Sequence, residues 1–107
     1  IMWQESRYQA GAVSATSDYG IMQINQGNHE WLEEELGVTD WLDPKQNILA
    51  GVYILSAFDY DDPHKVLMSY NCGPTGARNL WEDGIYSTAY SRAVVETLNG
   101  LEVMTND

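Results

Sequence analysis

The stretch QESRYQAGAVSATSDYGIMQIN, residues 4–25, decides the fold and raises the central question about function. It follows the apolar opening IMW. It places Glu5 on a stripe with Ile1 and Tyr8, because residues at i, i+4 and i+7 share one face of a helix. We therefore predict the end of a helix over residues 1–8, with an acid on its apolar face.

A carboxylate on an apolar helix face is costly to ionise, because desolvation favours the neutral form. A carboxyl group that stays protonated near neutral pH can act as a general acid. Glu5 is therefore a candidate catalytic acid. The alternative is that Glu5 only flanks the stripe and points into solvent.

Proline, glycine and capping residues divide the rest of the chain into helices. Residues 9–20 are rich in Gly, Ser, Thr and Ala, which predicts a loop with at most a short hairpin. The expected helices run from the cap Asn28 to Leu36, which Gly37 closes, from Asp43-Pro44 to about Phe58, from Asp62-Pro63 to about Cys72, over residues 75–83, and from the cap Ser87 to about Leu98.

The helix that begins at Asp43-Pro44 is expected to bury Ile48, Val52 and Leu55 on one face. Gly51 lies inside this helix, where glycine costs about 1 kcal/mol relative to alanine. That cost predicts that another backbone passes close to Gly51.

The composition fits one compact domain and excludes several functions. The chain has 107 residues, 44% of them hydrophobic, and its four Trp and seven Tyr offer surfaces that stack on sugars. A formal net charge of −11 argues against nucleic acid and against an anionic membrane surface, because both need a basic face. No stretch is long enough to span a bilayer, and no signal peptide is visible.

Neither a metal, a cofactor nor a disulfide is expected. Cys72 is the single cysteine, and it forms no recognisable Cys–His motif with His29 or His64. These spacings do not make a zinc site, and a thiol nucleophile would need an adjacent histidine. Cys72 is instead expected to be a small buried residue.

Several motifs, taken in order, resemble the lytic transglycosylase family, which has a goose-type lysozyme-like fold. They are Glu5-Ser6, Ala12-Val13-Ser14, Gly20-Ile21-Met22-Gln23-Ile24, Tyr70-Asn71-Cys72-Gly73-Pro74 and Tyr90. The resemblance runs from Glu5 to about Val94. It implies a mainly α (α+β lysozyme-like) fold: one compact helical domain over residues 1–107, with a substrate groove and little or no sheet. Because the chain opens directly in a helical pattern, we expect a domain cut from a longer protein with its first helix truncated.

The resemblance also implies roles for residues in the first half of the chain. Glu5 matches the catalytic glutamate at the end of a helix. Ser14 matches a serine thought to hydrogen-bond near that acid, although it is also a plausible turn residue. Met22 and Gln23 match residues that line the sugar groove, and Met22 is alternatively plain core.

In the second half, Tyr70 and Asn71 match the Tyr-Asn pair on the opposite wall of the groove. Tyr90 matches a tyrosine that points toward the acid. Core packing is the alternative for Tyr70 and Tyr90, and a helix end is the alternative for Asn71. The family usually has alanine on both sides of the Tyr-Asn pair, where this chain has Ser69 and Cys72.

The number of catalytic carboxylates decides the expected reaction. The family cleaves the β-1,4 bond between N-acetylmuramic acid and N-acetylglucosamine in peptidoglycan with one carboxyl group, and it leaves a 1,6-anhydro product. The run Ser17-Asp18-Tyr19-Gly20 instead resembles c-type lysozymes, in which the matching aspartate is a second carboxylate and the product is hydrolytic. A structural turn residue is the alternative for Asp18. Transglycosylase and muramidase activities are therefore both open, and a glycan-binding module without catalysis is the third candidate.

The resemblance implies peptidoglycan strands as the partner and an extracytoplasmic location, in the cell wall, secreted, or associated with phage or conjugation. We expect a monomer without membrane insertion of this domain, and tethering to other domains is left open.

Overall fold

The computed structural model describes the backbone of residues 1–106 and the side chains of residues 1–101. In this part the chain is mainly helical with one two-stranded sheet, as the sequence predicted. The chain forms two compact units, Ile1–Ser56 and a second unit that begins at Ala57. The expected single domain over residues 1–107 stays a prediction. None of the described helices is both long and apolar enough to cross a membrane.

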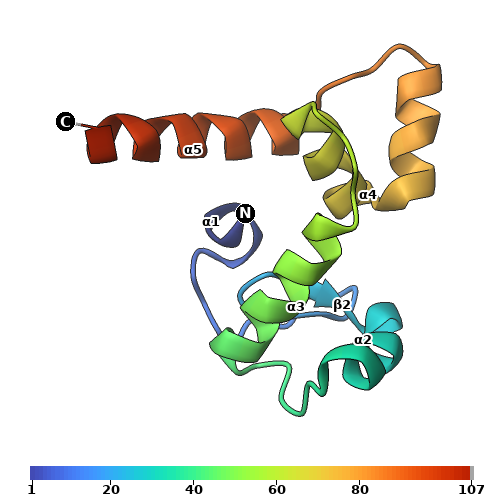
Figure 1. The fold of residues 1–107 in the computed structure, drawn as a ribbon, viewed down its shortest axis with the longest axis vertical. Coiled ribbons are helices and arrows are strands. Elements are labelled where there is room, and N and C mark those ends of the chain that lie inside the picture. The colour runs from blue at the N-terminus through green and yellow to red at the C-terminus, as the bar shows by residue number, and fades with distance from the viewer. Residues whose placement is uncertain (107) are drawn as a thin grey trace. The chain divides into compact units, whose positions relative to one another are not determined.

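The first unit places a small sheet among helices (Figure 1). Strand β1 pairs antiparallel with β2, and Val13 forms a further bridge with Tyr19 inside the expected loop. The elements are α1 (Met2–Ser6), β1 (Asp18–Tyr19), β2 (Ile24–Asn25), the 3-10 helix η1 (Gln26–Asn28), α2 (His29–Leu36) and α3 (Pro44–Ser56).

Helix α1 ends earlier than the sequence predicted. Arg7 and Tyr8 have φ angles of 54° and 62°, in the left-handed region that terminates helices. Tyr8 therefore lies outside the helical stripe and is 53% exposed. The prediction that Tyr8 shares a helix face with Glu5 is therefore wrong. It failed because Arg and Tyr rarely adopt left-handed backbone, so their presence in the sequence gives no sign that the helix ends there.

The boundaries of α2 and α3 largely follow the sequence signals. Gly37, with φ of 72°, closes α2 as expected. Asn28 precedes α2, but its side-chain oxygen accepts from Nε1 of Trp31 (3.1 Å) instead of from a helix amide. Asp43 Oδ2 accepts from the amide of Gln46 (3.2 Å) at the start of α3.

The buried face of α3 differs from the expected one. Asn47, Ala50 and Gly51 are buried, whereas Val52 is 53% exposed. An ideal Cβ on Gly51 would lie 2.5 Å from Cε of Met22, so a side chain and not the predicted backbone passes close there. The prediction failed because a polar residue and two small residues form this face, and none of them contributes to an apolar period.

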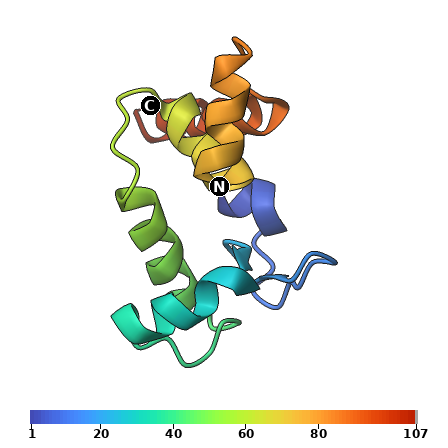
Figure 2. The same cartoon turned by 90° about the vertical axis from the view of Figure 1, so that its right-hand side faces the viewer.

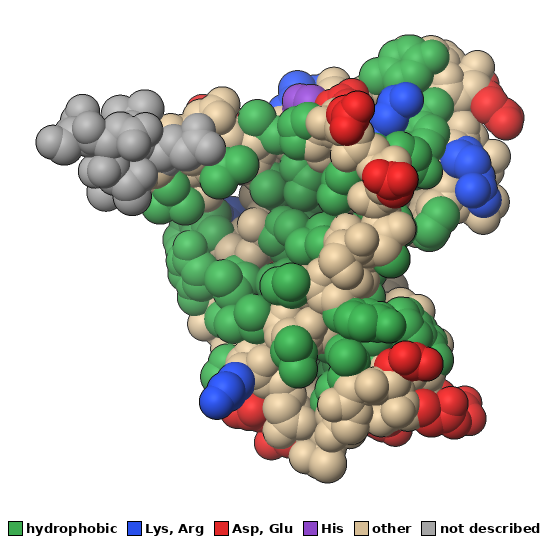
Figure 3. All heavy atoms as spheres, viewed as in Figure 1, with side chains coloured by type: hydrophobic (Ala, Val, Ile, Leu, Met, Phe, Trp, Pro, Cys, Tyr) green, Lys and Arg blue, Asp and Glu red, His purple; other side chains and the backbone are tan. Residues whose placement is uncertain are grey.

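The opposite face of α3 is apolar and exposed. Leu49, Val52 and Tyr53 lie on it, and the ring of Trp31 from α2 lies 6.1 Å from that of Tyr53. In Figure 3, hydrophobic side chains gather over α3 and beside α2 on the face in view.

The second unit consists of two helices packed together, α4 (Pro63–Glu82) and α5 (Ala89–Asn106) (Figure 2). Gly73 has φ 78° and ψ 156°, so α4 is two helical segments joined at a break, as the Gly73-Pro74 signal predicted. Helix α5 continues past Gly100, beyond the expected end.

The cap of α5 is Thr88 and not the expected Ser87. Thr88 Oγ1 accepts from the amide of Ser91 (3.1 Å), and Ser91 Oγ accepts from the amide of Thr88 (2.8 Å). This reciprocal pair satisfies two amides at the helix start. Ser87 Oγ instead accepts from the guanidinium of Arg92 (2.8 Å).

Candidate active site

Glu5 lies half-buried in the last turn of α1, next to a serine that fixes the helix end. The hydroxyl of Ser6 is 2.7 Å from the carbonyl oxygen of Ile21 and 3.2 Å from that of Met2. Ser6 is only 8% exposed, so the shorter contact is a shielded hydrogen bond. The helix end that carries Glu5 is thereby tied to the turn Gly20–Gln23.

The turn itself needs glycine at its first position. Gly20 has φ of 80°, and an ideal Cβ there would lie 2.7 Å from the carbonyl oxygen of Trp41. It would lie still closer to the side-chain amide nitrogen of Asn47. Gln23 also has a positive φ, 53°. Left-handed backbone at a residue other than glycine costs about 1–2 kcal/mol, and such strain persists only where surrounding contacts over-determine the conformation.

The side chain of Asn47 provides several of the contacts that hold the turn in this conformation. Its side chain is fully buried, and its Oδ1 accepts from the amide of Met22 (2.8 Å). Its Nδ2 donates to the carbonyl oxygens of Tyr19 and Trp41, both at 2.8 Å. One side chain of α3 therefore binds a backbone group within the turn, a second just before it, and a third in the segment that leads into α3. No hydrophobic pattern in the sequence reveals this hydrogen-bonding role of Asn47.

Met22 and Gln23 contribute to the turn from within it. Met22 is 3% exposed and packs on Gly51 of α3. Nε2 of Gln23 donates to the carbonyl oxygens of Gly20 (2.9 Å) and Ala12 (3.2 Å), so both of its amide protons bind backbone. The expected sugar-lining role of Met22 and Gln23 stays a prediction beside this structural one.

Ser14, in the loop after α1, contacts Asp18 at the start of β1. Asp18 Oδ2 accepts from the hydroxyls of Ser14 (2.8 Å) and Thr16 (2.5 Å), and Oδ1 accepts from Nδ2 of Asn25 (2.9 Å). The hydroxyl of Ser14 also accepts from the amide of Asp18 (3.0 Å). These contacts cross-link the loop to β2.

The network sets the charge of Asp18. Partial burial raises the pKa of the carboxyl group, but the hydrogen bonds from Thr16, Asn25 and Ser14 together outweigh it. The pKa of Asp18 therefore lies below its ordinary value, and the group is an ionised acceptor held by three donors.

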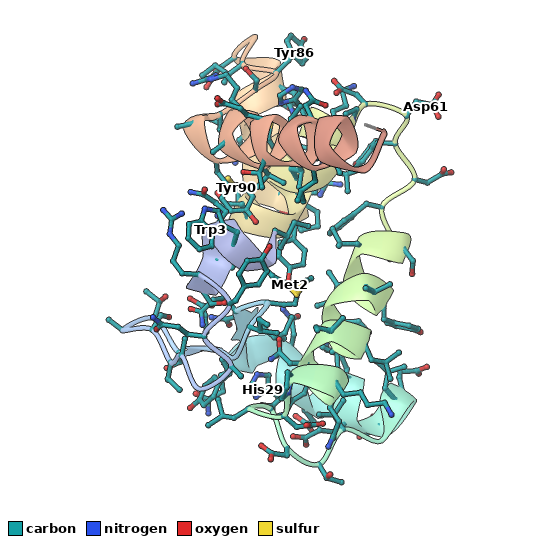
Figure 4. All side chains as sticks on the ribbon, turned by 90° about the vertical axis from the view of Figure 1, so that its left-hand side faces the viewer. Met2, Trp3, His29, Asp61, Tyr86 and Tyr90 are labelled. Carbon is teal, nitrogen blue, oxygen red and sulfur yellow. The ribbon has the colours of Figure 1, made fainter. Side chains whose placement is uncertain are left out.

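An aromatic stack supports the segment that follows the turn. The ring of His29, labelled in Figure 4, lies 3.9 Å from that of Trp41 in parallel stacking and 5.1 Å from the ring of Tyr19, edge to face. Nε2 of His29 is 3.0 Å from the carbonyl oxygen of Ile24. His29 is therefore used in packing. Among the described residues, no group of three or more His, Cys, Asp and Glu side chains could hold a metal ion.

The second unit carries the remaining site residues predicted from sequence. Tyr70 is half-buried and Asn71 is exposed, and both lie on α4 just before the break at Gly73. Tyr90 is half-buried in the first turn of α5. Cys72 is exposed, so the expectation that it is a small buried residue is wrong, and its thiol lies 3.6 Å from Oδ1 of Asn71.

Comparisons with known proteins identify the family. Residues 1–91 match the family described as transglycosylase SLT domain, a range that contains every site residue predicted from sequence. The membrane-bound lytic murein transglycosylase F of Desulfosudis oleivorans is 38% identical over 82 residues, which cover 68% of this chain. The chain spans 17% of the length of that relative. None of the solved structures compared with the chain matches it significantly. The helix end that carries the candidate acid is hydrogen-bonded to a strained turn, and the family match covers most of the chain. The chain therefore belongs to the transglycosylase SLT domain family.

Proposed function

We propose that this chain is the catalytic domain of a peptidoglycan lytic transglycosylase. It cleaves the β-1,4 bond between N-acetylmuramic acid and N-acetylglucosamine and leaves 1,6-anhydro-N-acetylmuramic acid. Membership of the transglycosylase SLT domain family and the similarity to a lytic murein transglycosylase support this proposal. The domain acts outside the cytoplasm, in the cell wall, and is tethered to other parts of a longer protein.

Glu5 acts twice in the proposed reaction. As a general acid it protonates the glycosidic oxygen, and the acetamide of the muramic acid stabilises the cationic sugar that forms. The resulting carboxylate of Glu5 then takes the proton from the 6-hydroxyl group, whose oxygen closes the anhydro ring. The proton that Glu5 gave stays on the 4-hydroxyl group of the departing sugar, the 6-hydroxyl proton restores the acid, and no water is consumed.

The observation that carries this proposal is the hydrogen bond from Ser6 to the carbonyl oxygen of Ile21. It joins the helix end that holds Glu5 to a turn that Asn47 holds through the amide of Met22 and, just before the turn, through the carbonyl oxygen of Tyr19. A catalytic acid needs this kind of support, because displacement by about 1 Å can cost a hundredfold in rate.

The state of Asp18 supports a mechanism with one carboxylate. A second catalytic carboxylate would have to attack the sugar or activate water, as in the muramidase alternative. The oxygens of Asp18 already accept from Ser14, Thr16 and Asn25. Recruiting them for catalysis would break bonds that hold the loop, so we assign Asp18 a structural role.

The sugar-binding roles are also proposals. Both amide protons of Gln23 are used within the turn, which leaves its Oε1 to accept from a sugar hydroxyl or acetamide N–H. Asn71 is exposed and offers its Nδ2 as a donor. Tyr70, Tyr90, Met22 and Ser14 complete the proposed set, with the last two acting through the turn and the loop that they support.

Glu5→Gln tests the function directly. The substitution keeps the shape but removes the transferable proton, so release of soluble fragments from purified sacculi should fall by about a thousandfold. Glu30→Gln, an exposed glutamate at the start of α2, is the matched control and should cleave like the parent. Cleavage by neither protein would favour a glycan-binding module, and equal cleavage by both would show that Glu5 is not the catalytic acid.

A further inference from the structure

Arg7 directly follows the helix that carries Glu5, and it is one of the few cationic side chains of an acidic chain. The chain has only five Lys and Arg against 16 Asp and Glu. In the first unit, Arg7 is the single arginine and Lys45 the single lysine. The interaction that the structure gives Arg7 is with an aromatic ring.

The guanidinium group lies over the ring of Trp3, which in turn contacts the ring of Tyr8. Cζ of Arg7 lies 4.4 Å from the centroid of Trp3, and the ring of Tyr8 lies 5.7 Å from that of Trp3. Trp3 is 41% exposed and projects from α1 (Figure 4). We call these residues the Trp3–Arg7–Tyr8 cluster. Stacking on a ring orients the plane of a guanidinium and leaves its edge N–H groups for a second partner.

The backbone holds the cluster in place at a cost. Arg7 and Tyr8 are two consecutive residues with left-handed φ, each about 1–2 kcal/mol less favourable than the right-handed form. The amide of Arg7 donates to the carbonyl oxygen of Trp3 (2.9 Å), which closes the helix that carries Glu5. The same strained turn therefore ends the helix of the acid and places the cation over Trp3.

We propose that the Trp3–Arg7–Tyr8 cluster binds a carboxylate of the stem peptide on peptide-bearing glycan strands, and so sets a preference for such strands over bare ones. This rests on the function proposed above. Guanidinium binds carboxylate through two parallel hydrogen bonds. The exposed rings would cover the apolar part of the peptide.

The exposed rings favour the peptide over the lactyl group as the source of the carboxylate. Arg7 lies beyond the end of α1 and beside Trp3, and the rings of Trp3 and Tyr8 are 41% and 53% exposed, an apolar surface that a peptide can cover. A lactyl carboxylate on a bare strand sits beside the bond being cleaved, close to Glu5. A peptide extends about 3.3–3.6 Å per residue and reaches around the short helix.

The test compares two substrates and two substitutions. Uncrosslinked strands with stem peptides are assayed beside the same strands after an amidase has removed the peptides and freed the lactyl carboxylates. For Arg7→Gln, kcat/KM on peptide-bearing strands should fall about fivefold, with a change below about twofold on bare strands. Lys45→Gln, an exposed cation on α3, is the control and should change neither. The preference of the parent for peptide-bearing strands should shrink in high salt.

Equal effects of Arg7→Gln on both substrates, or no effect on either, would overturn the proposal. A loss confined to bare strands would also overturn it and assign the cluster to the lactyl carboxylate. Failure of the parent to cleave either substrate would instead refute the proposed function. Retention on the two kinds of strand, immobilised, still tests the cluster in that case, because Arg7→Gln should weaken retention only where peptides are present.

Discussion

At the scale of single residues, Gly20 carries the tightest requirement in the first unit. Its φ of 80° demands a left-handed backbone, and its missing Cβ leaves room for Asn47 and the carbonyl oxygen of Trp41. Gly37 has a similar φ of 72° but nothing within 4 Å of an added Cβ. Comparing substitutions at these two glycines therefore separates the cost of backbone strain from the cost of steric overlap.

Gly20→Ala should lower the free energy of unfolding by about 3 kcal/mol, since it adds overpacking to backbone strain. Gly37→Ala should cost about 1 kcal/mol, from the strain alone. Urea denaturation of both variants beside the parent measures the difference. Equal losses in the two variants would show that the close approach of Asn47 contributes nothing.

Asp18 makes stability depend on pH in a defined direction. Its pKa is below the ordinary value of 3.8 in the folded chain, so its hydrogen bonds stabilise the fold above that value. The contribution is lost as pH falls from about 4 through the lower, folded pKa. Because the group is only partly buried, solvent screens these interactions and the effect is at most about 1 kcal/mol.

The parent should therefore exceed Asp18→Asn in unfolding free energy most clearly at pH 5–7, and the gap should close below about pH 4. Denaturant titrations across this range provide the measurement. A gap that stays constant or widens on acidification would contradict the account of Asp18 as a hydrogen-bonded carboxylate.

At the scale of elements, Asn47 is the link between α3 and the turn Gly20–Gln23. Asn47→Ala removes a fully buried side chain and leaves one amide and two carbonyl groups without their partner. The expected loss is about 3 kcal/mol in unfolding free energy, with a parallel fall in cleavage activity.

Asn79→Ala, an exposed position on α4, serves as its control and should stay within about 0.5 kcal/mol of the parent. Thermal and urea unfolding distinguish the two variants. If Asn47→Ala loses less than about 1 kcal/mol, the turn is held by other contacts and the pinning role is wrong.

Element boundaries were predictable where capping and helix-breaking residues mark them. Pro44, Pro63, Gly37 and Gly73 act within one or two residues of their own position, so their effect is visible in the sequence. The end of α1 was not predictable, because Arg7 and Tyr8 take a conformation that their residue types disfavour.

The residues of the candidate site also differ in whether a local sequence signal marks them. Glu5 and the Gly20–Gln23 turn could be found from ordered motifs, because those motifs keep their spacing along the chain. Ser6 and Asn47 were missed as supports, since their roles depend on hydrogen bonds across 15 and 25 positions. Contacts of that range leave no local pattern of hydrophobicity or charge.

At the scale of the whole molecule, the net charge of −11 opposes approach to an anionic wall. Raising salt from about 0.01 M to about 0.15 M shortens the Debye length from about 30 Å to about 8 Å. Cleavage of native sacculi should therefore speed up by about threefold over this range. Sacculi with amidated carboxyl groups are the control and should show a flat response, and a rate that falls equally on both would contradict the expected repulsion.

The whole account depends on Glu5 acting alone as acid and then base. The most direct test is the mass of the soluble muropeptides that the parent and Asp18→Asn release from purified sacculi. The account predicts that both produce anhydro ends, lighter by one water molecule than hydrolytic ends. Products with reducing ends only, or loss of all cleavage in a folded Asp18→Asn variant, would contradict it.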